Sequence, residues 1–130
     1  MKLKSIVILM VLVLSMSAQA SAYPLLEPSQ YGENQCELIA KAYQEIYFGS
    51  LVFIQPLDDR GQYVFEAYSG HWINRIYQKQ AGIIYFDYAT NTTLKSKEEV
   101  LDWYEVMTGK EAAIFDLAEG HPPFPLVWQY

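Results

Sequence analysis

The sequence contains a single cysteine and only two histidines among its 130 residues. Small secreted domains that depend on disulfides carry even numbers of cysteines, so an intrachain disulfide framework is excluded. One cysteine and two histidines fifty positions apart also lack the ligand spacing of a zinc site. No glycine-rich phosphate-binding motif occurs in the chain. We therefore expect neither a metal nor a cofactor.

Positive charge is also scarce in this chain. Nine Lys and Arg stand against fifteen Asp and Glu, which gives a net charge of −6, and the cations are scattered. Proteins that track nucleic-acid phosphates need clustered cations. Nucleic acid is therefore not an expected partner. The hydrophobic fraction of 52% is high enough for a packed core and argues against disorder.

The N-terminal segment has the pattern of an export signal. Two lysines precede the apolar run Ile6–Leu14, which is far shorter than the roughly 20 residues needed to span a bilayer. Small residues allow cleavage after Ala20 or Ala22. We expect residues 1–22 to be a signal peptide and residues 23–130 to be one secreted or periplasmic domain, with no membrane contact after cleavage. The oligomeric state stays open.

Two helices are predicted, one on each side of a β-rich region. Asn34 is a good N-cap, and apolar residues at helical spacing follow it until Gly49. Ser96 and Glu99 form a capping box for a second amphipathic helix, which Gly109 ends.

Four β-rich segments lie between the helices, and turn-forming residues separate them into two hairpins. The segments are Ser50–Gln55, Tyr63–Tyr68, His71–Tyr77 and Ile83–Tyr88. Three prolines in His121–Pro125 indicate an irregular C-terminal tail. This order predicts an α+β domain in which the N-terminal helix packs on an antiparallel sheet of about four strands, with a second helix and an irregular tail.

The lone cysteine, Cys36, falls near the start of the first predicted helix. Unpaired backbone N–H groups and the positive end of the helix dipole stabilise a thiolate there. A buried small hydrophobic residue and a thiol that pairs with another chain are the alternatives. The position favours a nucleophile.

A thiolate mechanism needs a base, and His71 is the better of the two histidines because it opens a strand directly after a turn. His121 precedes two prolines and is expected to be an exposed loop residue. Direct pairing across the second hairpin would place Asp87 opposite His71 on one face, where it could orient the imidazole. Arg75 and Tyr77 would share that face and either line a cleft or form ordinary sheet surface.

Three stretches of the chain carry a resemblance to a known family: Gly32–Ala40, His71–Trp72 and Tyr85–Thr90. They resemble the minimal core of the transglutaminase-like group of papain-like cysteine enzymes, over about half of the chain. The resemblance implies that Cys36 is the nucleophile, His71 the base and Asp87 the residue that orients it. The chain departs from the family pattern where Trp72 directly follows the histidine and where Tyr-Ala-Thr follows the aspartate.

Other candidate site residues are weaker. Gln30 lies six residues before Cys36, the offset at which papain-like enzymes resemble one another in supplying an oxyanion side chain, although a polar loop residue explains it better. Trp72, Arg75 and Tyr77 are the candidate substrate-binding residues.

These residues predict a secreted cysteine hydrolase or acyl-transferase that acts on amide bonds of a peptide or protein substrate through a thioester. Hydrolysis, deamidation and cross-linking all stay open. The alternative is a non-catalytic binding module, either cystatin-like or an inactive transglutaminase-like fold, with an aromatic concavity for a peptide or protein partner. Its candidate residues are Tyr63, Phe65, Trp72, Tyr85, Phe86, Trp103 and Trp128.

Overall fold

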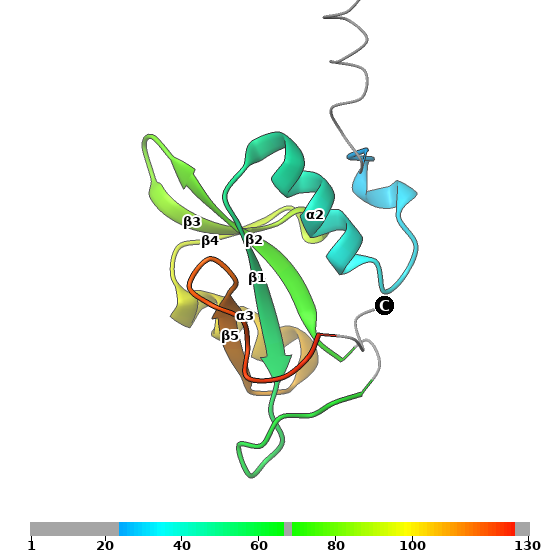
Figure 1. Cartoon of the computed structure of the whole chain (residues 1–130), viewed down its shortest axis with the longest axis vertical. Coiled ribbons are helices and arrows are strands. Elements are labelled where there is room, and N and C mark those ends of the chain that lie inside the picture. The colour runs from blue at the N-terminus through cyan, green and yellow to red at the C-terminus, as the bar shows by residue number, and fades with distance from the viewer. Residues whose placement is uncertain (1–23, 67–68, 127–130) are drawn as a thin grey trace, which may run out of the picture.

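The computed structural model describes residues 24–66 and 69–126 (Figure 1). The expected signal peptide, on which the expected localisation depends, lies outside the described residues. The helices and strands in chain order are η1 (Pro28–Gln30), α2 (Cys36–Tyr47), β1 (Ser50–Pro56), β2 (His71–Gln78), β3 (Gly82–Asp87), η2 (Tyr88–Thr90), β4 (Thr92–Leu94), α3 (Lys97–Thr108) and β5 (Ala112–Asp116). Within the described chain, each helix is too short or too polar to span a bilayer.

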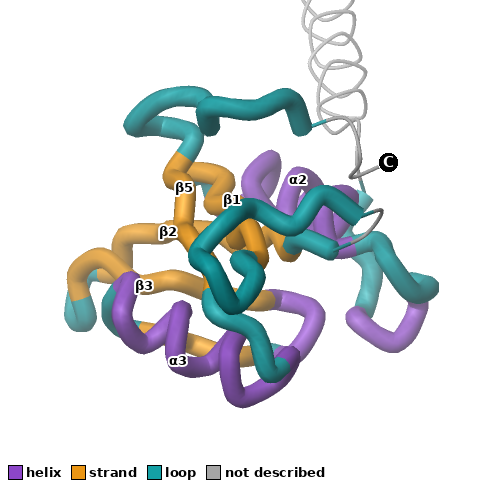
Figure 2. Tube along the Cα trace, turned by 90° about the horizontal axis from the view of Figure 1, so that it is seen from below, coloured by secondary structure: helices purple, strands orange, loops and turns teal. Residues whose placement is uncertain are grey.

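The five strands form one antiparallel sheet in the order β4-β3-β2-β1-β5. Helix α2 packs on one face of this sheet and α3 on the other, so the sheet lies between the two helices (Figure 2). The expected α+β architecture, with the N-terminal helix on an antiparallel sheet and a second helix, is therefore confirmed, although the sheet has one strand more than expected.

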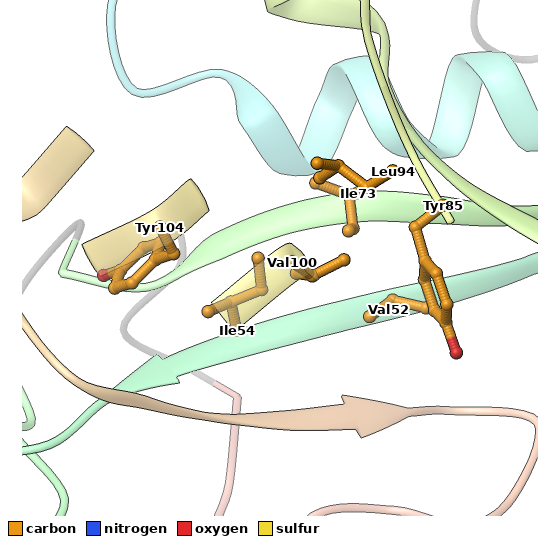
Figure 3. Packing of buried hydrophobic residues seen from close by; sticks show 7 residues of the cluster. All are labelled: Val52, Ile54, Ile73, Tyr85, Leu94, Val100 and Tyr104. Carbon is orange, nitrogen blue, oxygen red and sulfur yellow. The ribbon is translucent and has the colours of Figure 1, made fainter. Parts of the chain in front are cut away.

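The core between the sheet and α3 consists of apolar side chains that alternate along the strands with those of the other face. Its buried residues, shown in Figure 3, are Val52, Ile54, Ile73, Tyr85, Leu94, Val100 and Tyr104. Helix α3 begins as predicted, because the Ser96 side chain accepts a hydrogen bond from the backbone N–H of Glu99 at 3.1 Å. It ends at Gly109, which has the left-handed conformation expected of a C-cap.

The opposite face holds α2 against the middle of the sheet. Ala40 of α2 is buried against Phe53 and Trp72, and the side-chain amide of Asn74 on β2 donates to the Ala40 carbonyl at 2.9 Å. The N-cap of α2 is Gln35, not Asn34 as predicted, because Asn34 takes a left-handed conformation with φ of 60°. Cys36 is therefore the first residue of the helix.

The predicted hairpin between the first two β-rich segments is wrong. Strand β1 is hydrogen-bonded to β2 along one edge and to β5 along the other, so it has no edge left for residues 63–66. That segment is tied to the end of β1 by a bridge between Leu57 and Tyr63. The Val64 backbone N–H also donates to the Pro56 carbonyl at 3.0 Å, and the Gln55 amide donates to the Val64 carbonyl at 2.6 Å.

Strands β4 and β5 were not predicted. The first has only three residues, which is too short to show a period of two. The second, Ala112–Asp116, lies in the stretch expected to be irregular, and its partner β1 is more than fifty residues away in sequence. The predicted irregular tail thus begins only after β5.

The turn between α2 and β1 yields a test of the packing. Gly49 has φ of +80°, and a Cβ there would collide with the Arg75 carbonyl oxygen, whereas Gly82 has φ of +75° with no atom within 4 Å. We expect Gly82→Ala to cost only the strain of a left-handed residue, about 1–2 kcal/mol of unfolding free energy. Gly49→Ala should cost clearly more. Urea unfolding compares the two variants, and equal losses would contradict the close approach of Gly49 to β2.

Candidate active site

The tertiary structure brings the three predicted catalytic residues to one end of the sheet. Cys36 is the first residue of α2, His71 the first of β2 and Asp87 the last of β3. Because β2 and β3 are antiparallel, the start of β2 lies beside the end of β3. The packing of α2 over β2 carries the helix N-terminus to the same place (Figure 1).

The strand register differs from the predicted one by two residues. Asn74 pairs with Phe86, so Asp87 continues the ladder opposite Ile73 and not opposite His71. The direct pairing was therefore wrong. Side chains alternate with a period of two along a strand, so a shift of two residues still leaves His71 and Asp87 on the same face. They meet as diagonal neighbours.

His71 and Asp87 form a buried ion pair. The Nε2 atom of His71 lies 3.3 Å from the Oδ1 atom of Asp87, and only 3% of the aspartate side chain is exposed. The Nε2 atom is buried and makes no hydrogen bond of good geometry, so its attraction to Asp87 is chiefly that of an ion pair. The Oδ2 atom of Asp87 accepts a hydrogen bond from the Thr90 hydroxyl at 2.7 Å.

His71 and Cys36 line the same cleft, and the Cys36 thiol is one of the groups that act on the imidazole. Burial lowers the pKa of His71, but hydrogen bonding and charge interactions with Asp87 and Cys36 outweigh this effect and raise it to about 9. The imidazole is therefore protonated at neutral pH. An imidazolium beside a cysteine favours the thiolate, which is the nucleophilic form.

A cleft of about 230 Å³ opens beside Cys36 and His71. It lies between the loop that precedes α2, the turn that precedes β2, and η2. Its other lining residues are Gly32, Asn34, Gln35, Ile39, Gly70 and Ala89. Two glycines and an alanine leave room for a substrate main chain to approach the sulfur. The backbone N–H of Cys36 is among the amides that have no acceptor within the helix, so it can donate to a developing oxyanion.

The weaker site candidates lie elsewhere. Gln30 belongs to η1, and its side-chain oxygen accepts from the Glu27 backbone N–H at 2.9 Å. Trp72 is buried on the α2 face against Phe53, with the ring centroids 5.1 Å apart. Neither residue lines the cleft.

Arg75 and Tyr77 share the face of His71, as predicted, but neither lines the cleft. The Nε atom of Arg75 lies 2.9 Å from an oxygen of Asp116, whose side chain is fully buried. Tyr77 is 74% exposed near the far end of β2. His121 is an exposed loop residue, as expected, and its Nδ1 atom lies 2.8 Å from the Pro122 carbonyl oxygen.

The aromatic residues proposed for a binding concavity do not share one surface. Trp72 packs on the α2 face of the sheet and Tyr85 on the α3 face, so the sheet separates them. Tyr63 and Phe65 are partly exposed and pack against Phe124. Trp128 lies outside the described residues.

Three residues around the site were not assigned to the catalytic site from the sequence. The ring centroid of Trp103 on α3 lies 5.8 Å from that of His71, whereas the sequence placed Trp103 in the apolar stripe of the helix and among the residues of the alternative aromatic concavity. Next to it, the Tyr104 hydroxyl donates to the Ser69 carbonyl at 3.0 Å and so fixes the turn before His71. Thr90 lies in the stretch that carries the family resemblance, but its contact with Asp87 depends on the turn after β3.

Comparison with family models, curated proteins and solved structures finds no match for this chain. The side-chain geometry of residues 36, 71 and 87 is therefore what bears on function. Among residues 24–66 and 69–126, no group of three His, Cys, Asp or Glu side chains is placed to hold a metal ion.

The His71–Asp87 pair predicts a pH-dependent stability. The pKa of His71 in the folded state is about 9, above its ordinary value of 6.5. The stabilisation is therefore complete below about pH 6.5 and is lost as the pH rises through about 9. Within this window the unfolding free energy should fall by up to ~1.4 kcal/mol per pH unit from this group. Asp87→Asn should abolish that slope, as measured by urea unfolding at a series of pH values. The same slope in both proteins would show that Asp87 does not hold the proton.

Proposed function

We propose that this protein is a cysteine hydrolase of the papain-like, transglutaminase-like type, acting on amide bonds of a peptide or protein. One observation carries the proposal: a thiol at a helix N-terminus lines the same cleft as an imidazole that is paired with a buried carboxylate, and acts on that imidazole. Nucleophilic catalysis requires a nucleophile, a base and a group that orients the base, and Cys36, His71 and Asp87 are of the right types for these three roles.

In the first half-reaction, the Cys36 thiolate attacks the carbonyl carbon of a substrate amide. Negative charge moves to the carbonyl oxygen, where the Cys36 backbone N–H supplies a hydrogen bond. The carbon–nitrogen bond then breaks while His71 gives its proton to the departing nitrogen, which leaves as an amine or as ammonia. A thioester between Cys36 and the acyl group remains. Asp87 keeps the imidazole oriented throughout.

In the second half-reaction, the neutral His71 takes a proton from an incoming nucleophile, which attacks the thioester and releases the Cys36 thiolate. Water gives an acid, by proteolysis of a main chain or deamidation of a side chain, and a primary amine gives a cross-link. Cys36 is partly exposed and the cleft borders solvent, so water reaches the thioester. We therefore favour hydrolysis over amine transfer.

The cleft also suggests the form of the substrate. Its lining carries no Lys, Arg, Asp or Glu, and much of it is backbone or small side chains. An extended, uncharged main-chain segment fits such a cleft better than a bulky small molecule. The export signal expected at residues 1–22 would place this activity outside the cytoplasm.

Cysteine labelling tests the Cys36–His71 pair without a substrate. We expect iodoacetamide to label Cys36 rapidly at about pH 6.5 and His71→Ala to slow that labelling at least about tenfold, because the imidazolium that favours the thiolate is lost. His121→Ala is the matched control and should label at the wild-type rate. Mass spectrometry follows the modification. Labelling that His71→Ala leaves unchanged would contradict the proposed pair.

Turnover tests the reaction itself. We expect the wild-type protein to release amines from a heterogeneous peptide mixture, and Cys36→Ala to abolish the release. Asp87→Asn should lower the rate by up to about 10⁴-fold, the size of the loss when the orienting aspartate of a triad becomes asparagine. Mass spectrometry of the products distinguishes hydrolysis from deamidation and cross-linking. Binding of peptides without any turnover, unchanged in Cys36→Ser, would instead support a non-catalytic binding module.

A further inference from the structure

We propose that Thr90 and Thr92 form a hydroxyl relay that fixes the Asp87 carboxylate, and that both are positioning residues of the site. The inference rests on the proposed function, since the group that is positioned is the one that orients His71. Neither threonine lines the cleft, so both act through Asp87 and not on the substrate.

The two oxygens of the Asp87 carboxylate have separate partners. The Oδ1 atom faces His71 Nε2 at 3.3 Å, and the Oδ2 atom accepts from the Thr90 hydroxyl at 2.7 Å. A carboxylate that is 3% exposed needs such partners, because each unpaired oxygen would carry an uncompensated loss of hydration.

The number of protons that each group can donate fixes the direction of the hydrogen bonds in the relay. An ionised carboxylate only accepts hydrogen bonds, and a hydroxyl has a single proton to donate. The Thr90 proton is committed to Asp87, so Thr92 is the donor in the 2.8 Å contact between the Thr90 and Thr92 hydroxyls. The Thr90 backbone carbonyl lies 3.3 Å from the Thr92 hydroxyl and is a second, more distant acceptor for the same proton. The hydrogen bonds therefore run from Thr92 to Thr90 to Asp87, and each strengthens the next.

The turn after β3 builds this arrangement. Residues Tyr88–Thr90 form η2, and Asn91 then takes a left-handed conformation with φ of 51°, which asparagine tolerates better than most residues. The chain reverses there and returns as β4, in which Thr92 pairs directly with Asp87. Directly paired residues share a face, so Thr92 approaches from the strand and Thr90 from the turn.

Without the Thr90 donor, little would hold the carboxylate against rotation about its terminal torsion, which has a broad energy profile. Rotation would carry Oδ1 away from Nε2. The titratable groups that act on His71 are Cys36 from α2 and Asp87 from β3, while α3 presents the neutral ring of Trp103. Asp87 is thus the one anion besides the nucleophile, within the described residues, through which the relay can influence His71.

Four variants test the relay. Thr90→Val keeps the shape of the side chain and removes the donor to Asp87, and Thr90→Ser restores the hydroxyl. Thr92→Val removes the hydroxyl that contacts the Thr90 hydroxyl and the Thr90 carbonyl, and leaves the Thr90 donor in place. Thr93→Val is the matched control, because Thr93 is exposed and pairs with Phe86 on the other face. The first readout is the titration of the His71 ring by nuclear magnetic resonance, and the second is the iodoacetamide labelling rate of Cys36.

We expect Thr90→Val to lower the titration midpoint of His71 and to slow Cys36 labelling at neutral pH about tenfold, the lower end of the effect of losing a supporting hydrogen bond at a site. Thr90→Ser should restore both, Thr92→Val should show a smaller loss, and Thr93→Val should match the wild type. In turnover, Thr90→Val should lower kcat and leave KM unchanged, since no substrate contact is lost.

A wild-type midpoint in folded Thr90→Val, or a Thr90→Ser variant that is as impaired as Thr90→Val, would overturn the relay. If Thr90→Val does not fold, Thr92→Val decides, and a wild-type midpoint there overturns the proposal. Neither readout needs a substrate. If Thr90→Val lowers the titration midpoint of His71 but the wild-type protein never turns over a peptide, the relay is therefore sustained and the hydrolase is rejected.

Discussion

The site depends on a buried carboxylate that must be neutralised. Removing an unpaired carboxylate from water costs several kcal/mol even after the protein relaxes, so Asp87 can stay at the end of β3 only with partners for both oxygens. His71 supplies the positive charge and Thr90 the hydrogen bond. The proton that Asp87 holds on His71 is also the proton that the proposed reaction delivers to the leaving group, so the same pairing serves stability and chemistry.

The two helices support this end of the sheet from opposite faces. On one face, Asn74 ties α2 to β2 through the Ala40 carbonyl, one turn along the helix from Cys36. On the other face, α3 holds the turn before His71 through Tyr104 and sets Trp103 against the imidazole. A packed interior resists small displacements. The sulfur and the imidazole, which come from different elements, are therefore held in position relative to each other without any covalent link.

Local sequence signals predicted the parts of the site that depend on one element alone. A cysteine at the start of an amphipathic helix, a histidine at the start of a strand and an aspartate on the next strand each follow from neighbouring residues. The shared face of His71 and Asp87 also followed, because a register shift of two preserves the alternation. The predicted first hairpin was wrong and β5 was not predicted, because both depend on which distant strand pairs with each edge of β1.

The sequence by itself therefore determined the α+β class, the two helices, the β2–β3 hairpin and the residue types available for a nucleophile, a base and an orienting acid. Only the tertiary structure decided that Thr90, Trp103 and Tyr104 surround them and that Gln30, Arg75 and Tyr77 do not. The physical reason is the distance along the chain over which each kind of interaction acts. Helix periodicity and turn chemistry act over a few residues, whereas the partners of a buried charge are chosen by the packing of elements that lie far apart in the chain.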